Sequence, residues 1–142
     1  VFGGSFGGPA ALLLASDPRV DKVVAVSPVV DWRAPSRAEP MAWLTKFIRE
    51  AFGEGYRYSE KDWKKLMRGK FYSPVHEQDM IDGSKILIFH AKDDESVLWR
   101  PVAKFAKATG SQLVVYKRGG HLGSRFLLRP TVNKRVQKFL RS

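Results

Sequence analysis

A serine enclosed by glycines stands at the start of the chain, and this short segment constrains the fold more than any other. Gly3, Ser5 and Gly7 form a Gly-x-Ser-x-Gly pattern, preceded by two apolar residues and followed by the apolar run Gly8–Ala15. A strand end, a glycine-bounded serine and a helix start are the parts of a nucleophile elbow, in which the serine hydroxyl projects from a strained turn. We expect both glycines to be needed, because a Cβ at either position would collide with the neighbouring strand or helix. Taken alone, the pattern fits a tight turn with an idle serine equally well.

The residue after the serine has an expected role of its own. In an elbow, the backbone N–H of Phe6 donates one hydrogen bond to the oxyanion that forms on the substrate. The helix that follows directs the partial positive charge of its N-terminus toward the same place.

Beyond this segment, helical and strand-like stretches alternate along the chain. The run Pro9–Ala15 is apolar nearly all round and predicts a helix buried behind the serine. Compact apolar segments predict strands buried on both faces of a parallel sheet, and amphipathic segments predict helices between and after them. The expected strands are Val20–Ser27, Lys85–His90 and Gln112–Tyr116, and the expected helices are Arg100–Thr109 and Thr131–Leu140. This alternation predicts an α/β domain with a mostly parallel sheet flanked by helices.

Residues 33–78 separate two expected strands by far more than a crossover needs. An apolar stripe from Met41 to Ala51 predicts one amphipathic helix, and Ser59-Glu60-Lys61-Asp62 has the form of a capping box that opens a second. We interpret the segment as a small helical insertion, or lid, beside the site. Most of its aromatic side chains are expected to attach it to the body. The candidates for a substrate pocket are Trp32, Trp43 and Phe47.

Length and composition limit the remaining choices. The chain has 142 residues, of which 44% are hydrophobic, so it forms one domain or part of one with a real core. It has no cysteine, which excludes disulfides, thiolate metal sites and cysteine nucleophiles and fits a reducing, cytoplasmic compartment. No run approaches the roughly 18 apolar residues of a membrane span. We expect no metal, no cofactor and no membrane partner.

The net charge of +11 raises the question of nucleic-acid binding. The basic residues are scattered, and only Lys61–Lys70 and Arg125–Arg141 are locally dense. Both segments have the pattern of solvated helix faces, which favours solubility or mild anion attraction over a nucleic-acid surface. We therefore expect no nucleic-acid partner, although a basic binding module remains an alternative.

A serine nucleophile needs a base, and the base needs an orienting acid. Of the three histidines, His121 lies among glycines after the last expected strand, at the edge where ligand sites of α/β sheets form. We therefore predict His121 as the base. His90 ends a strand and is expected to be structural, and His76 lies in a loop.

The acid should follow the strand that precedes the base-bearing strand, where Asp93 and Asp94 stand side by side. Adjacent carboxylates cannot both point at one imidazole, and the spacing favours Asp94. The alternative for a carboxylate of this solvated turn is to cap the coming helix, a role that Asp93 or Glu95 fits better. Asp31, after an earlier strand, stays open as the alternative acid.

With serine, aspartate and histidine in this order, the chain resembles the C-terminal half of an α/β-hydrolase-fold serine hydrolase. More closely it resembles the prolyl-oligopeptidase-like group, with its acylaminoacyl-peptidases and dipeptidyl-peptidase relatives. Where this chain has Ala91 and Leu98, members of the group usually have glycine and proline. The matching stretches are Gly3–Gly8, Ser27–Trp32, Tyr72–Pro74, Ile86–Val97 and Gly119–His121.

The resemblance implies a hydrolase that cleaves a small ester or a peptide through a Ser5–His121–Asp94 triad and an acyl-enzyme. It also implies that residues 1–142 are part of a catalytic domain whose N-terminal half, with a second oxyanion donor, lies upstream. The chain opens on Val1, within an expected strand, so we expect residues 1–142 alone to be loosely folded and nearly inactive. A non-catalytic interaction domain that keeps the fold is the alternative.

Overall fold

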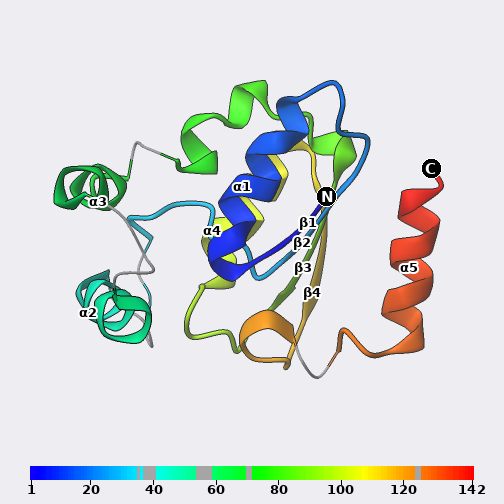
Figure 1. The fold of residues 1–142 in the computed structure, drawn as a ribbon. Helices are drawn as coiled ribbons and strands as arrows, with labels where there is room; N and C mark the ends of the chain where they lie inside the picture. The colour runs from blue at the N-terminus through cyan, green and yellow to red at the C-terminus, as the bar shows by residue number, and fades with distance from the viewer. Residues whose placement is uncertain (35, 37–40, 54–58, 70–71, 124–125) are drawn as a thin grey trace.

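A parallel sheet of four strands, in the order β1-β2-β3-β4, forms the centre of the computed structural model (Figure 1). The structure describes residues 1–34, 36, 41–53, 59–69, 72–123 and 126–142. The strands are β1 (Phe2–Gly4), β2 (Val23–Val26), β3 (Ile86–Ala91) and β4 (Gln112–Tyr116). The parallel sheet predicted from the sequence is therefore confirmed.

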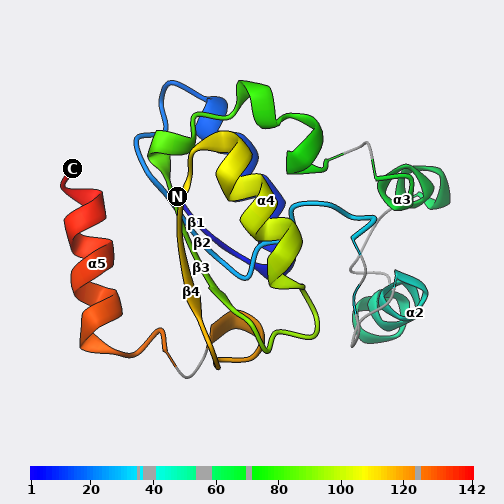
Figure 2. The ribbon, with the colours of Figure 1, turned by 180° about the vertical axis from the view of Figure 1, so that it is seen from behind.

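Helices cover both faces of this sheet. Helices α1 (Gly8–Leu13) and α4 (Trp99–Thr109) lie on one face, and α5 (Pro130–Leu140) lies on the other (Figures 1 and 2). Gly110 ends α4 with a φ of 74°, in the left-handed conformation that glycine adopts without steric cost. The layers are those of an α/β fold, as predicted.

Successive side chains of β2 and β3 point to opposite faces of the sheet, so each face has its own apolar core. Both strands are buried along their whole length, which explains why their sequences are uninterrupted apolar runs. One set of alternate residues packs with α1 and α4, namely Val23, Ala25, Ile86 and Ile88. The other set packs with Val132 and Phe139 of α5, namely Val24, Val26, Leu87 and Phe89.

Two elements are shorter than predicted. Helix α1 passes at Leu14 into a 3-10 turn that ends at Ser16, because the following Asp17 is extended and precedes a proline. Strand β2 begins at Val23 and not at Val20, because the amide of Val20 donates to the carbonyl of Asp17 in a turn.

Helices α2 (Met41–Phe52) and α3 (Glu60–Met67) stand apart from the sheet, beyond α1 and α4 (Figure 2). Both agree with the sequence prediction, and Ser59 caps α3 by accepting a hydrogen bond from the amide of Asp62 at 3.1 Å. A separate apolar cluster holds these helices to the body and consists of Trp32, Ile48, Trp63 and Leu66, with Phe6, Val29 and Leu44 packed against it.

The two ends of this helical segment meet at Trp32. Its indole Nε1 donates to the carbonyl of Tyr72 at 2.8 Å, and its amide donates to the buried hydroxyl of Ser73 at 3.4 Å. These contacts close the base of the segment. Of the predicted insertion 33–78, residues 35, 37–40, 54–58 and 70–71 lie outside the described residues.

Candidate active site

The register of the sheet brings the ends of the strands together. Gly4 of β1 pairs with Val26 of β2, and Val26 pairs with Phe89 of β3. In a parallel sheet all carboxyl ends lie at the same edge. The residues that follow β1, β2, β3 and β4 therefore meet there, and Ser5, Ser27, Asp94 and His121 all come from these connections.

Ser5 occupies a strained position directly after β1. Its φ is 47°, a conformation that side-chain-bearing residues rarely adopt and that costs on the order of 1–3 kcal/mol. A 3-10 turn, Ser5–Gly7, joins it to α1. The carbonyl of Ser5 accepts a hydrogen bond from the amide of Val29 at 3.1 Å, so the segment after β2 supports the turn. This is the strained geometry predicted for the elbow.

The predicted requirement for glycine holds at Gly3 but is wrong at Gly7. A Cβ added to Gly3 would lie 2.5 Å from the Cβ of Ala11. A Cβ at Gly7 would meet none of the described atoms within 4 Å, because its backbone is helical and faces open space. The second close approach is at Gly8, where a Cβ would lie 2.5 Å from the Cβ of Pro28.

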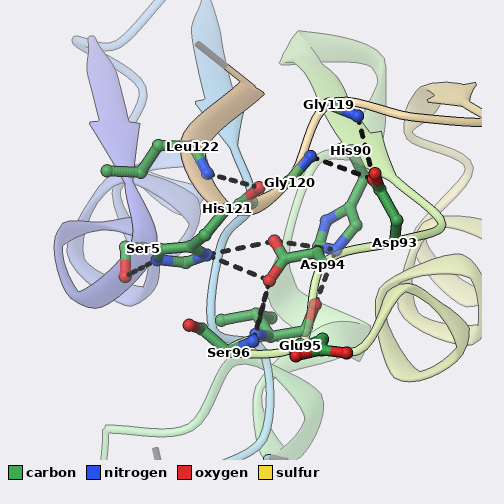
Figure 3. A network of polar contacts seen from close by, with 12 residues as sticks. Ser5, His90, Asp93, Asp94, Glu95, Ser96, Gly119, Gly120, His121 and Leu122 are labelled. Carbon is green, nitrogen blue, oxygen red and sulfur yellow. Dashed lines mark hydrogen bonds and ion pairs between the residues drawn. The ribbon is translucent and has the colours of Figure 1, made fainter. Parts of the chain in front are cut away.

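One histidine connects the serine to a carboxylate (Figure 3). The Nε2 atom of His121 lies 2.7 Å from the hydroxyl of Ser5, and its Nδ1 lies 3.0 and 3.1 Å from the carboxylate oxygens of Asp94. A carboxylate only accepts hydrogen bonds, so Nδ1 carries the proton and donates it. The neutral ring then has a free electron pair on Nε2 that accepts the hydrogen bond of the Ser5 hydroxyl.

Asp94 is held as a buried carboxylate. It is 2% exposed and accepts hydrogen bonds from the amides of Ser96 at 3.0 Å and Val97 at 2.9 Å. Burial by itself would raise the pKa of Asp94, but the hydrogen bonds from His121, the Val97 amide and the Ser27 hydroxyl together lower it below its usual range. The group is therefore ionised at neutral pH.

The two other candidate acids have different partners. One carboxylate oxygen of Asp93 accepts hydrogen bonds from the amides of Gly119 and Gly120, both at 2.9 Å (Figure 3). The expectation that Asp93 or Glu95 caps the coming helix is thus wrong, since Asp93 binds the loop that carries His121 and the N-cap residue of α4 is Leu98. Asp31 accepts from the amide of Arg33 at 2.9 Å within its own turn. The structure brings Asp94 to the imidazole.

Neither of the other two histidines bridges Ser5 and Asp94, although the Nε2 atom of His90 lies 3.6 Å from a carboxylate oxygen of Asp94. His90 is fully buried, and its Nε2 donates to the carbonyl of Val97 at 2.8 Å. Burial lowers the pKa of His90, partly offset by that carbonyl and by the charge of Asp94, so the ring is neutral. His90 supports the turn that presents Asp94, as a structural residue would. His76 is exposed on a 3-10 turn.

Sequence reasoning missed the part played by Ser27. This residue follows β2, is fully buried and has a φ of 46°. Its hydroxyl accepts a hydrogen bond from the amide of Leu122 at 3.2 Å. The available signal was its position, one residue past a buried strand at the edge where sites form.

The aromatic residues proposed for a pocket fall into two groups. Trp32 is 8% exposed, and its ring meets that of Phe6 edge-on at 4.9 Å, so it packs the helical segment against the elbow. Trp43 and Phe47 stack on each other at 5.0 Å on α2 and are each 43% exposed. A role in substrate binding stays a prediction for all three.

Among the residues that the structure describes, no group of three or more histidine, aspartate or glutamate side chains is placed to hold a metal ion. No helix among the same residues has the length and apolarity to cross a membrane.

The whole chain, residues 1–142, matches the model of the prolyl oligopeptidase family. It belongs to this family. No curated protein matches the chain.

Solved structures show the same fold. Dipeptidyl peptidase 4 of Porphyromonas gingivalis is similar to 98% of the chain with a TM-score of 0.68 and 21% identity, and the chain spans 18% of that protein. An esterase of Pyrococcus furiosus is similar to 99% with a TM-score of 0.66 and 18% identity, and the chain spans 52% of it. Acetyl xylan esterase 1 of Thermoanaerobacterium is similar to 99% with a TM-score of 0.64 and 20% identity, and the chain spans 44% of it. At these identities the similarity establishes the α/β-hydrolase fold. The chain spans at most 52% of any of these three proteins.

Proposed function

We propose that the protein cleaves acyl bonds with Ser5 as nucleophile, His121 as general base and Asp94 as the acid that orients the base. The observation that carries the proposal is the unbroken hydrogen-bonded chain from the Ser5 hydroxyl through both ring nitrogens of His121 to Asp94, at 2.7 and 3.0 Å. A serine, a base within hydrogen-bond reach and an orienting third group make up the arrangement used for covalent acyl transfer.

The steps follow from these positions. The Ser5 oxygen attacks the acyl carbonyl carbon while His121 takes its proton, and the carbonyl oxygen becomes an oxyanion. The ring then gives the proton to the leaving alcohol or amine, and the acyl group stays on Ser5. Water attacks this acyl-enzyme with His121 again as base, which releases the carboxylic acid and restores the serine.

Two groups stabilise the charges that develop. Asp94 accepts the hydrogen bond from Nδ1–H throughout, which fixes the tautomer of His121 and stabilises its charged form. The backbone N–H of Phe6 is proposed as one oxyanion donor, because it directly follows the nucleophile. A single donor of this kind contributes about 2.7–4 kcal/mol of transition-state stabilisation.

The proposed substrate is a small ester or a peptide. The similar structures include both dipeptidyl peptidases and esterases, and the residues of the site serve either chemistry because the nucleophile attacks the same carbonyl carbon. We propose no cofactor or nucleic-acid partner, and the cytoplasmic location expected from the composition stays a prediction.

We also propose that residues 1–142 need additional chain for full activity. Strand β1 lies at the edge of the sheet and exposes 68% of Phe2, so the strand that carries the elbow lacks a neighbour on one side. The experiments below therefore use the complete natural polypeptide that contains residues 1–142.

Pre-steady-state hydrolysis tests the proposal. With p-nitrophenyl acetate we expect a burst of one nitrophenolate per active site followed by slower turnover, and Ser5→Ala should abolish both phases. A peptide p-nitroanilide assayed in parallel distinguishes peptidase from esterase activity. If Ser5→Ala hydrolyses either substrate as fast as the unchanged protein, the proposal is wrong.

A further inference from the structure

The loop that carries His121 crosses the carboxyl edge of the sheet from β4 to β1. Neighbouring strands lie about 4.8 Å apart, so the three steps from β4 to β1 span about 14 Å. On this path Gly120, Leu122 and Gly123 have φ values of 62°, 60° and 61°. Leu122 carries a side chain in a conformation that favours glycine, which persists only where the surroundings enforce it. The loop therefore needs external support to keep the imidazole in one place.

The first support comes from the connection after β3. A single carboxylate oxygen of Asp93 accepts the hydrogens of two successive amides, those of Gly119 and Gly120, each at 2.9 Å (Figure 3). Hydrogen bonds to an ionised acceptor are roughly twice as strong as those between neutral groups. Gly119 and Gly120, which precede His121, are thus hydrogen-bonded to Asp93, which precedes Asp94.

The second support comes from the connection after β2. The hydroxyl of Ser27 accepts the amide hydrogen of Leu122 at 3.2 Å. Ser27 is fully buried and has a φ of 46°, so the chain holds it in a strained conformation at the place where its hydroxyl reaches this amide. The residue that follows His121 is thus hydrogen-bonded to the residue that follows β2.

We propose that Asp93 and Ser27 are positioning residues that clamp the His121 loop from its two sides, an inference that rests on the proposed function of the site. Three amides around His121 are held, those of Gly119 and Gly120 by Asp93, which precedes Asp94 in the chain, and that of Leu122 by Ser27. These hydrogen bonds hold the loop so that the Nε2 atom of His121 stays within reach of the Ser5 hydroxyl. Neither clamp residue contacts the reacting atoms.

The hydrogen-bond acceptor at position 93 is tested by a pair of variants. Asp93→Ala removes the acceptor and should lower kcat for p-nitrophenyl acetate by about ten- to hundredfold with little change in KM, because small displacements of a catalytic group have effects of this size. Asp93→Asn keeps an oxygen in place and should recover most of the loss. Asp79→Ala, at an exposed aspartate of a 3-10 turn, is the control.

Amide hydrogen exchange measures the hydrogen bonds of the clamp independently of catalytic activity. In the unchanged protein the amides of Gly119, Gly120 and Leu122 should be protected. Asp93→Ala should speed exchange at the two glycines, and Ser27→Ala should speed it at Leu122 and also lower kcat. Unprotected amides at these positions in the unchanged protein would overturn the proposal, even if a variant failed to fold.

The outcomes separate this inference from the function on which it depends. If Ser5→Ala abolishes hydrolysis while Asp93→Ala and Ser27→Ala both keep the kcat of the unchanged protein, the clamp is wrong and the proposed function stands. If Asp93→Ala lowers kcat while the amides of Gly119 and Gly120 stay as protected as in the unchanged protein, the accepted hydrogen bonds are not the cause, and the clamp is again wrong. If Ser5→Ala keeps full activity, the proposed function itself fails.

Discussion

The Nε2 atom of His121 lies 2.7 Å from the hydroxyl of Ser5, although 116 positions separate the two residues in the sequence. Ser5 follows β1 and His121 follows β4, so the whole width of the described sheet lies between their strands. The contact exists because the parallel strands end at one edge and the loop after β4 crosses that edge. The geometry of the site is therefore a property of the sheet register and of the loop together.

The contact between Asp94 and His121 predicts that Asp94→Asn lowers kcat far more than Asp31→Asn does. Asp94→Asn should reduce kcat by about 10⁴-fold, because an amide in place of the carboxylate favours the wrong imidazole tautomer. Asp31→Asn should change kcat little, since Asp31 binds only within its own turn in the contacts observed. Steady-state hydrolysis of p-nitrophenyl acetate by both variants measures this, and the reverse ranking would move the acid to Asp31.

The glycines of the elbow predict an uneven tolerance to alanine. Gly3→Ala and Gly8→Ala each place a Cβ 2.5 Å from another carbon atom, so each should lower the free energy of unfolding by about 1–3 kcal/mol. Gly7→Ala meets open space in a helical backbone and should change stability by no more than about 0.5 kcal/mol. Urea unfolding of the three variants gives the comparison. Equal losses at Gly3 and Gly7 would show that the close approach does not determine the residue.

These glycines also show what sequence reasoning could predict. The Gly-x-Ser-x-Gly pattern located the strained serine, since a strand end and a helix start flank it in the sequence itself. The need for Gly8 depends on Pro28, which follows another strand, and only the packing of the two segments reveals that contact. Local pattern thus predicted the turn, and tertiary packing decided which glycine it needs.

The acid and its neighbours give the same lesson. Spacing favoured Asp94, and the structure brings this residue to the imidazole of His121, because the order of strands places it one connection before the histidine. The contacts of Asp93 and Ser27 were not predictable, since both depend on the path of the loop after β4 across the sheet edge. The strands were predicted well where turns bound them closely, as at Gln112–Tyr116, and less well at Val20, where the turn extends into the apolar run.

Burial of His90 predicts a pH dependence of stability. Its pKa is lowered in the folded chain, so below about pH 6.5 the unfolded chain binds a proton that the folded chain does not. The free energy of unfolding should then fall as the pH decreases from 6.5, with this residue contributing up to about 1.4 kcal/mol per pH unit. Asp94, whose pKa is also lowered, loses its contribution only as the pH falls below 3.8, so the two effects separate.

His90→Gln provides the matched comparison, because its amide nitrogen can take the place of Nε2 toward the carbonyl of Val97. Urea unfolding between pH 7 and pH 5 should show a shallower pH dependence in this variant. If the two proteins respond to pH in the same way, the buried imidazole is not the source.

The contacts of Trp32, which join the two ends of the helical segment, predict that Trp32→Phe destabilises the protein more than Trp43→Phe. Trp32→Phe removes the hydrogen bond to the carbonyl of Tyr72 and leaves that carbonyl without this donor, at a cost of about 1–3 kcal/mol. Trp43→Phe, on an exposed face of α2, should cost less than about 0.5 kcal/mol. Thermal unfolding together with limited proteolysis of the segment compares them, and equal behaviour would mean that Trp32 does not close its base.

The central claim is that Ser5 is a nucleophile activated by His121. Reaction of the complete polypeptide with a fluorophosphonate, followed by peptide mass spectrometry, tests this claim most directly. We predict one covalent adduct, located on Ser5, whose formation is abolished by Ser5→Ala and slowed strongly by His121→Ala. An unlabelled Ser5 in folded protein, or equal labelling of the Ser5→Ala variant, would contradict it.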